Sequence, residues 1–223
     1  MHHRRTIVVC VLAVAFAGWG CSHSSDAVAP AYPPPPPNSP NNVVRLLEWC
    51  WRNRAIAEYS EIFTDDFRFQ FALGDSAGNA YRDAPFTRED ELRCATRLFV
   101  GSGGQPPASE ILLDLDRVLV TLPDDRPGRD PKWHKSIRSS VDLQVTIDRG
   151  SGPERVGVRG HALFYLVRGD SAAIPPDLAA LGFTPDSTRW WIERWEDETL
   201  PGGGSRAQPS QNRTWGAVKT LFR

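Results

Sequence analysis

A stretch rich in proline near the start of the chain limits where folded structure can form. The segment from Ser22 to Asn42 contains Pro30, five consecutive prolines from Pro33 to Pro37, and Pro40. Proline fixes φ and lacks a backbone N–H, so we expect a stiff, extended spacer here rather than helix or sheet. At about 3.1 Å per residue, roughly 21 residues span at most about 65 Å. The other interpretation is a proline-rich ligand for an aromatic groove on a partner protein.

The residues before this spacer have the layout of an export signal. Arg4 and Arg5 give a positive start, and the run from Thr6 to Ala17 is apolar apart from Thr6. Such a run suits the apolar region of a signal peptide and is shorter than the about 20 residues that cross a membrane. The sequence therefore predicts a signal peptide at residues 1–20 and a tether at residues 21–42.

The end of this signal resembles the lipobox of bacterial lipoproteins, in which a lipid is attached to a cysteine. Gly20 and Cys21 match that pattern, whereas Gly18 stands where leucine is usual and Trp19 is bulky for its place. The resemblance implies an exported protein anchored in the cell envelope through lipidated Cys21. It favours the outer membrane, facing the periplasm, because Ser22 is not an aspartate. Ordinary cleavage after the small-x-small residues 27–29 is the alternative.

The remaining chain is long enough for one domain with its own core. We place this domain at residues 43–199, followed by a linker and a short C-terminal helix at residues 200–223. The whole chain has a formal net charge of −1, which becomes −3 when Arg4 and Arg5 leave with the signal. Nucleic-acid binding needs a basic surface to neutralise phosphates, so this composition argues against a nucleic-acid partner.

Two cysteines remain in the domain, Cys50 and Cys94. An oxidising compartment permits a disulfide between them. The alternative is a pair of small buried thiols on separate helices, because sequence alone does not give the Cα distance that a bridge requires.

The first half of the domain has the periodicity of helices. Apolar residues at spacings of three and four predict a helix over residues 43–63, broken near Asn53, with Asn41 and Asn42 as candidate caps. Phenylalanines then alternate with polar residues over 67–71, which predicts a strand.

A second helix is predicted over residues 88–99. Thr87 and Asp90 fit a capping box loosely, and glycines at residues 101–104 end the helix. These glycines follow a helix and lack a lysine, so they do not indicate a phosphate-binding loop.

The second half of the domain has the periodicity of strands. Strands are predicted at residues 111–122, 141–148, 156–168 and 189–198. An insertion at residues 170–185 includes one helical turn, and a helix at residues 214–223 is expected to dock back on the domain. Helices followed by strands predict an α+β fold, in which antiparallel hairpins are covered on one face by helices.

Three segments in this order resemble the nuclear transport factor 2-like superfamily, which includes SnoaL-like polyketide cyclases and ketosteroid isomerases. They are the first helix with its ending FTDDFRF (residues 63–69), the second helix, and the last strand WWIERWED (residues 190–197). The resemblance implies a cone-shaped, curved antiparallel sheet packed on the N-terminal helices, with an apolar pocket at its open end. It also implies dimerisation through the sheet.

The resemblance places pocket candidates on the first helix and on the strands. These candidates are Tyr59, Phe63, Phe67, Phe164, Trp190, Ile192 and Arg194. In the last strand, Trp190, Ile192, Arg194 and Glu196 would face the cone. Trp191 and Trp195 would then lie on the opposite face, covered either by a second subunit or by the insertion at 170–187.

No residue set in the domain matches a known catalytic or metal motif. His134 and His161 are far in sequence from the cysteines, so we expect no metal site and no cofactor. Tyr59, His161, Glu193 and Asp197 are candidates for acid–base chemistry in an apolar cone, but none matches a family motif, and no catalytic residue is assigned.

The leading hypothesis is therefore an exported, lipid-anchored domain that binds a small apolar ligand or a protein without catalysis. The alternative is an isomerase, dehydratase or cyclase that acts on an apolar carbonyl substrate. A third is an envelope protein in which the domain serves only as a dimerisation unit.

Overall fold

The computed structural model describes residues 32–81, 85–102, 104–148, 150, 152–199 and 211–223. The chain divides into two compact units, Met1–Ala31 and Tyr32–Arg223, and the described residues belong to the second. The predicted signal peptide and Cys21 lie outside them. Among the described residues, no helix has the length and apolarity needed to cross a membrane.

The predicted first helix forms two pieces. Helix α1 spans Pro40–Asn53, and α2 spans Ile56–Ser60. The predicted break is confirmed, because Arg54 adopts a left-handed conformation with φ of 53°. The helix begins earlier than expected, since the Ser39 side chain accepts a hydrogen bond from the Asn42 N–H and Pro40 occupies the first turn.

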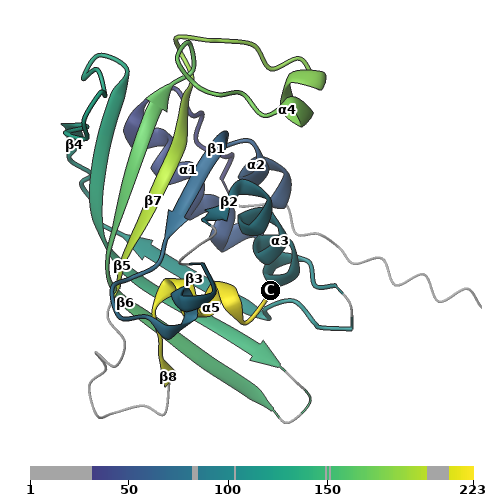
Figure 1. Ribbon diagram of the computed structural model, residues 1–223. Coiled ribbons are helices and arrows are strands. Elements are labelled where there is room, and N and C mark those ends of the chain that lie inside the picture. The colour runs from purple at the N-terminus through teal and green to yellow at the C-terminus, as the bar shows by residue number, and fades with distance from the viewer. Residues whose placement is uncertain (1–31, 82–84, 103, 149, 151, 200–210) are drawn as a thin grey trace, which may run out of the picture. The chain divides into compact units, whose positions relative to one another are not determined.

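One mixed sheet forms the other layer (Figure 1). Its strands are β1 (Phe63–Gln70), β2 (Phe86–Thr87), β3 (Glu110–Leu115), β4 (Thr121–Pro123), β5 (His134–Asp148), β6 (Pro153–Arg168), β7 (Trp190–Thr199) and β8 (Gln211–Asn212). The order is β2-β1-β7-β6-β5-β3, with β4 paired to β5 and β8 to β6. The β1–β7 and β6–β8 pairs are parallel, so the expected antiparallel sheet has two parallel pairings.

Helices α1, α3 (Arg88–Phe99) and α5 (Trp215–Thr220) pack on one side of the curved sheet (Figure 1). The capping box is present in α3, with Thr87 and Asp90 bonded to each other's backbone. The predicted α+β fold class is thus confirmed. The expected strand at residues 111–122 is two strands, β3 and β4, because Asp116 and Arg117 leave the ladder between them.

The segment between β6 and β7 covers the other side of β7. It contains α4 (Pro176–Ala180), where one helical turn was predicted. Leu178 from α4 packs with Val167 and Trp191 in a small second core. Trp191 is therefore covered within its own chain by the insertion, which was one of the two expected arrangements.

A bulge in β7 changes which side chains face the helices. Leu166 pairs with Ile192 and Tyr165 pairs with Arg194, so Glu193 is an extra residue in the ladder. Trp190 and Ile192 face the main core as predicted, but beyond the bulge Trp195 does so as well. The expectation that Arg194 and Glu196 face inward is wrong, because an unbroken alternation was assumed across the bulge.

Cys50 and Cys94 are free, buried thiols rather than a disulfide. Burial raises the pKa of both, to about 12 for Cys94, so neither is a reactive thiolate near neutral pH.

Candidate functional site

A buried ion pair lies where α5 meets the rest of the domain. Glu91 on α3 and Lys219 on α5 are 1% and 3% exposed. Lys219 Nζ lies 2.5 Å from Glu91 Oε2, and the Tyr59 hydroxyl donates to Glu91 Oε1 at 2.5 Å. The carboxylate thus accepts bonds at both oxygens, one from a cation and one from a neutral donor.

Aromatic rings complete the surroundings of the Lys219 ammonium. Its Nζ lies 3.6 Å from the centre of the Trp195 ring and 3.8 Å from the centre of the Phe69 ring. Such distances allow cation–π attraction, which is strongest where water is absent. We call the set of Tyr59, Phe69, Glu91 and Trp195 the ammonium cage.

Burial shifts the proton equilibria in this cage. It lowers the pKa of Lys219, against the opposing effect of Glu91. Burial, followed by the charge of Glu91, raises the pKa of Tyr59 well above its usual value, so the phenol stays protonated and serves as a donor.

A second buried carboxylate holds the first turn of α5. Asp197 accepts bonds from the backbone N–H of Gly216 at 2.7 Å and of Thr199 at 2.9 Å. The Thr199 hydroxyl accepts a bond from the backbone N–H of Trp215 at 2.9 Å. Burial raises the pKa of Asp197, in opposition to these donors.

Three indole groups around α5 lack hydrogen-bond partners. The Trp51, Trp195 and Trp215 N–H groups are buried, and none has an acceptor in the described part of the chain. The Trp215 ring lies between the other two, with ring centres 5.2 Å from Trp51 and 4.2 Å from Trp195. These donors are three of the buried polar side-chain atoms that have no partner in the described residues.

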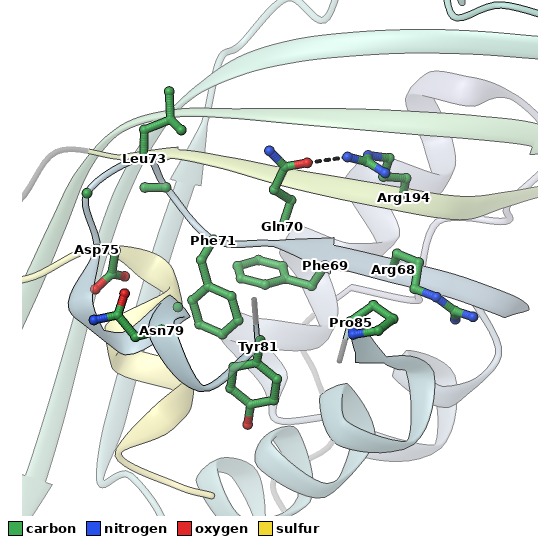
Figure 2. Close-up of a pocket in the computed structure, with 13 residues that line it drawn as sticks. Arg68, Phe69, Gln70, Phe71, Leu73, Asp75, Asn79, Tyr81, Pro85 and Arg194 are labelled. Atoms are coloured by element: carbon green, nitrogen blue, oxygen red, sulfur yellow. Dashed lines mark hydrogen bonds between the residues drawn. The ribbon is translucent and has the colours of Figure 1, made fainter. Parts of the chain in front are cut away.

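An open pocket with a volume of about 470 Å³ lies beside this interior (Figure 2). It is lined by the end of β1, the turn after it, the 3₁₀ helix η1 (Ser76–Tyr81), Pro85 and Arg194. Phe71 and Tyr81 stack in its wall with ring centres 5.0 Å apart and planes 12° apart. Phe69, part of the ammonium cage, also lines the pocket, so the two features share a wall.

Two arginines give the pocket its polar character. Arg194 is neutralised, because it bonds to Glu196 at 2.7 Å and also to Gln70 (Figure 2). Arg68 donates to the carbonyl of Phe67 at 2.6 Å, and no carboxylate pairs with it among the described residues. Arg68 is therefore a cation available to a ligand.

Most of the predicted pocket residues lie in the packed interior. Tyr59, Phe63, Phe67, Phe164 and Ile192 are fully buried in the main core, and Trp190 is 9% exposed. Of the predicted set, only Arg194 lines the open pocket. Trp215 and Phe222, from the C-terminal segment, fill space within the same core. A ligand-binding role for the buried candidates stays a prediction.

Two of the other acid–base candidates, Glu193 and Asp197, already have partners. Glu193 is bonded to Arg126, lies 3.2 Å from Arg129 and lies 4.0 Å from His134. Asp197 is held by backbone N–H groups, as described above. Within the described ranges, no three His, Cys, Asp or Glu side chains are grouped as metal ligands would be.

Sequence reasoning missed Glu91, Lys219 and Arg68. A signal existed for the first two, because each stands within an apolar stripe: Glu91 with Cys94 and Leu98, and Lys219 with Trp215 and Phe222. Oppositely charged residues in two apolar stripes are a signature of a buried pair. Arg68 gave no signal, since it alternates with phenylalanines as a solvent-facing strand residue would.

Comparisons with known proteins bear on the fold. No family model matches the sequence, and no curated protein is detectably similar to it. Similar solved structures include a conserved protein from Planctomyces limnophilus, with 14% identity, 72% of this chain and 92% of that one covered, and a TM-score of 0.45. A nuclear transport factor 2-like superfamily protein from Salmonella enterica has 9% identity, 74% and 92% coverage, and a TM-score of 0.43. A protein of unknown function from Mycobacterium tuberculosis has 12% identity, 82% and 83% coverage, and a TM-score of 0.42.

At such identities, the similarity concerns fold and carries nothing about ligand or reaction. The predicted α+β architecture, with helices packed on one side of a curved mixed sheet, is confirmed by the order of elements and by the sheet topology.

Proposed function

We propose that this chain is an exported, lipid-anchored domain that binds a small molecule in the open pocket, without catalysis. The ligand carries an acidic group on an aromatic or apolar body. The observation that carries the proposal is Arg68, which has no carboxylate partner among the described residues and lies in the same pocket as the stacked rings of Phe71 and Tyr81.

The chemistry of the pocket selects for such a ligand. A guanidinium offers several N–H donors in one plane and binds carboxylate, sulfonate or phosphate oxygens in pairs. The Phe71 and Tyr81 rings offer apolar surface for a ring or chain. A volume of about 470 Å³ falls within the range that small-molecule sites occupy.

The absence of catalysis in this proposal rests on the state of the carboxylates. Glu91 is neutralised by Lys219 and shielded by α5. Asp75 is the acid among the pocket-lining residues, and it accepts bonds from the Thr214 hydroxyl and the Ala77 N–H. Neither is a free base facing a substrate-sized space, as the isomerase or cyclase alternative needs.

Titration with 1-anilinonaphthalene-8-sulfonate, an aromatic anion, tests the pocket. We expect fluorescence to rise with saturation at one site per chain. Arg68→Gln should weaken binding about tenfold, the loss of one charge-assisted contact of about 1.5 kcal/mol. Arg155→Gln, on the exposed surface of β6, is the matched control and should have no effect. Equal binding by both variants would rule out Arg68 as the anion contact.

The anchor is tested separately in cells. Incorporation of labelled palmitate into the chain, lost in Cys21→Ser, would support lipidation. Export without label would favour ordinary cleavage near residues 27–29.

A homodimer through the sheet also stays a prediction. The family resemblance implied it, and two tryptophans expected on the opposite face of the sheet supported it, yet Trp191 and Trp195 are 1% and 0% exposed within one chain. Sedimentation of the purified protein would give the mass in solution.

A further inference from the structure

Lys219 occupies a cage that other elements build. Tyr59 comes from α2, Glu91 from α3, Phe69 from β1 and Trp195 from β7, whereas the ammonium comes from α5. A carboxylate with aromatic faces is a general means of recognising an organic cation. The cage is therefore a complete binding site whose occupant is a side chain of the same molecule.

We propose that α5 is an internal ligand, and that an external primary amine with an aromatic or apolar body competes with Lys219 and its neighbours for this cavity. The proposal goes beyond the proposed function, because the site is a different one and its ligand has the opposite charge. Trp215 and Phe222 represent the apolar body of such a ligand, and Lys219 represents its amine.

The ion pair is a costly way to fill a core. Replacing a buried ion pair with apolar residues of similar volume is often neutral or stabilising, because both charges must leave water. Burial disfavours the charged form of Lys219. Packing alone would thus be served by an apolar residue at position 219, and the charge points to recognition of an ammonium.

Indole N–H groups around α5 lack acceptors in the described residues, so α5 does not satisfy every hydrogen-bond donor that surrounds it. The Trp51 and Trp195 rings flank the Trp215 ring, and their buried N–H groups have no acceptor in the described residues. A buried donor without a partner costs about 1–3 kcal/mol. A ligand with an acceptor on its body, which the Trp215 indole lacks, would bond to one of them.

The position of α5 beside the open pocket gives an external ligand access. Phe71 lies against Gly216, where an added Cβ would come within 2.4 Å of the Phe71 ring. Asp75 accepts a bond from Thr214 at the start of the helix. Figure 2 shows Phe71, Asp75 and Phe69 along this boundary, so the pocket ends where α5 begins.

The test uses the full chain with 2-phenylethylamine as probe, and 2-phenylethanol and 3-phenylpropanoate as neutral and acidic controls. We expect calorimetry to show saturable binding of the amine only. Hydrogen exchange of the backbone amides at 214–223 should rise as the amine binds. No binding, or binding without faster exchange there, overturns the proposal.

Three variants sharpen this test. Trp215→Ala loosens α5 and should tighten amine binding about tenfold, because less competition must be overcome. Glu91→Gln should abolish amine binding, whereas Arg68→Gln should leave it unchanged, which separates this site from the anion pocket. If Glu91→Gln does not fold, hydrogen exchange at residues 214–223 of the wild type, with and without the amine, still tests the proposal.

Discussion

The two faces of β7 bury charge in different ways. The inner face holds a single ammonium, enclosed by rings and paired with Glu91. The outer face holds Glu193 and Asp124, bonded to arginines that are partly exposed: Arg126 is 23% and Arg129 is 35% exposed. The inner pair is 1% and 3% exposed, whereas the outer network reaches water through its arginines.

This difference teaches how a carboxylate of low exposure can be tolerated. On the outer face, two acids share the Arg126 guanidinium, so removal of one acid leaves Arg126 paired with the other and partly solvated. On the inner face, one acid neutralises one cation, and neither has a substitute. Loss of an inner partner should therefore cost far more than loss of an outer one.

The largest expected contrast is between the tryptophans of the two faces. Trp195→Ala should lower the free energy of unfolding by about 5 kcal/mol, since its ring contacts Phe69, Phe164 and Trp215 in the main core. Trp191→Ala should cost about 3 kcal/mol, because the ring that is removed belongs to the smaller cluster under the insertion. Urea unfolding measures both, and equal losses would break the distinction between the two cores.

The next contrast is between the two acids. Glu91→Ala leaves Lys219 without its partner and should cost about 4 kcal/mol. Glu193→Ala should cost about 2 kcal/mol, since Arg126 keeps Asp124 at 2.6 Å. Adding Lys219→Met to Glu91→Ala should restore much of the loss. A double variant no more stable than the single one would mean that the buried charge is not the cause.

As pH falls, the contributions of Asp197 on the inner face and Asp124 on the outer face to stability should change in opposite directions. Asp197 has a pKa raised by burial, so the folded state takes up its proton first as pH falls. The stability of the wild type relative to Asp197→Asn should then grow as pH falls toward 3.8, the usual pKa of the carboxyl. Asp124 behaves oppositely. Burial raises its pKa, but the hydrogen bonds and charge of Arg126 lower it by more, so the net pKa is below the usual 3.8. Its contribution, measured against Asp124→Asn, should be present at pH 5 and lost as pH falls below about 3.8.

The smallest effect is expected at the surface. Asp114→Ala removes an ion pair with Arg52 whose side chains are 68% and 46% exposed. We expect a change within about 0.5 kcal/mol in urea unfolding, the usual contribution of an exposed pair. A loss of stability as large as that of Glu193→Ala would show that the exposure of an ion pair does not determine how much it stabilises the fold.

Local patterns predicted the elements well. The break after Asn53, the Thr87–Asp90 capping box and the docking of the C-terminal helix all follow from spacing and cap chemistry, which neighbouring residues decide. The fold class followed from the order of those elements.

The candidate sites could not be predicted in the same way, because they depend on pairings between distant segments. Glu91 and Lys219 are 128 residues apart, so the apolar stripe around each one indicates burial but not which partner it meets. The bulge at Glu193 also left no local signal, so the faces of Trp195 and Arg194 were assigned in reverse. Register is defined by the pairing of two strands, so the sequence of one strand does not specify it.

That bulge has a consequence for changes in chain length. In a regular strand, loss of one residue turns every later side chain to the opposite face. Glu193 and Arg194 both face outward, so loss of Arg194 would restore regular alternation and keep Trp195 against α5. Loss of Asp197, by contrast, would turn Glu198 into the core and Thr199 out of it. Within β7, residues 193–194 are the place where a shorter chain could keep the same interior.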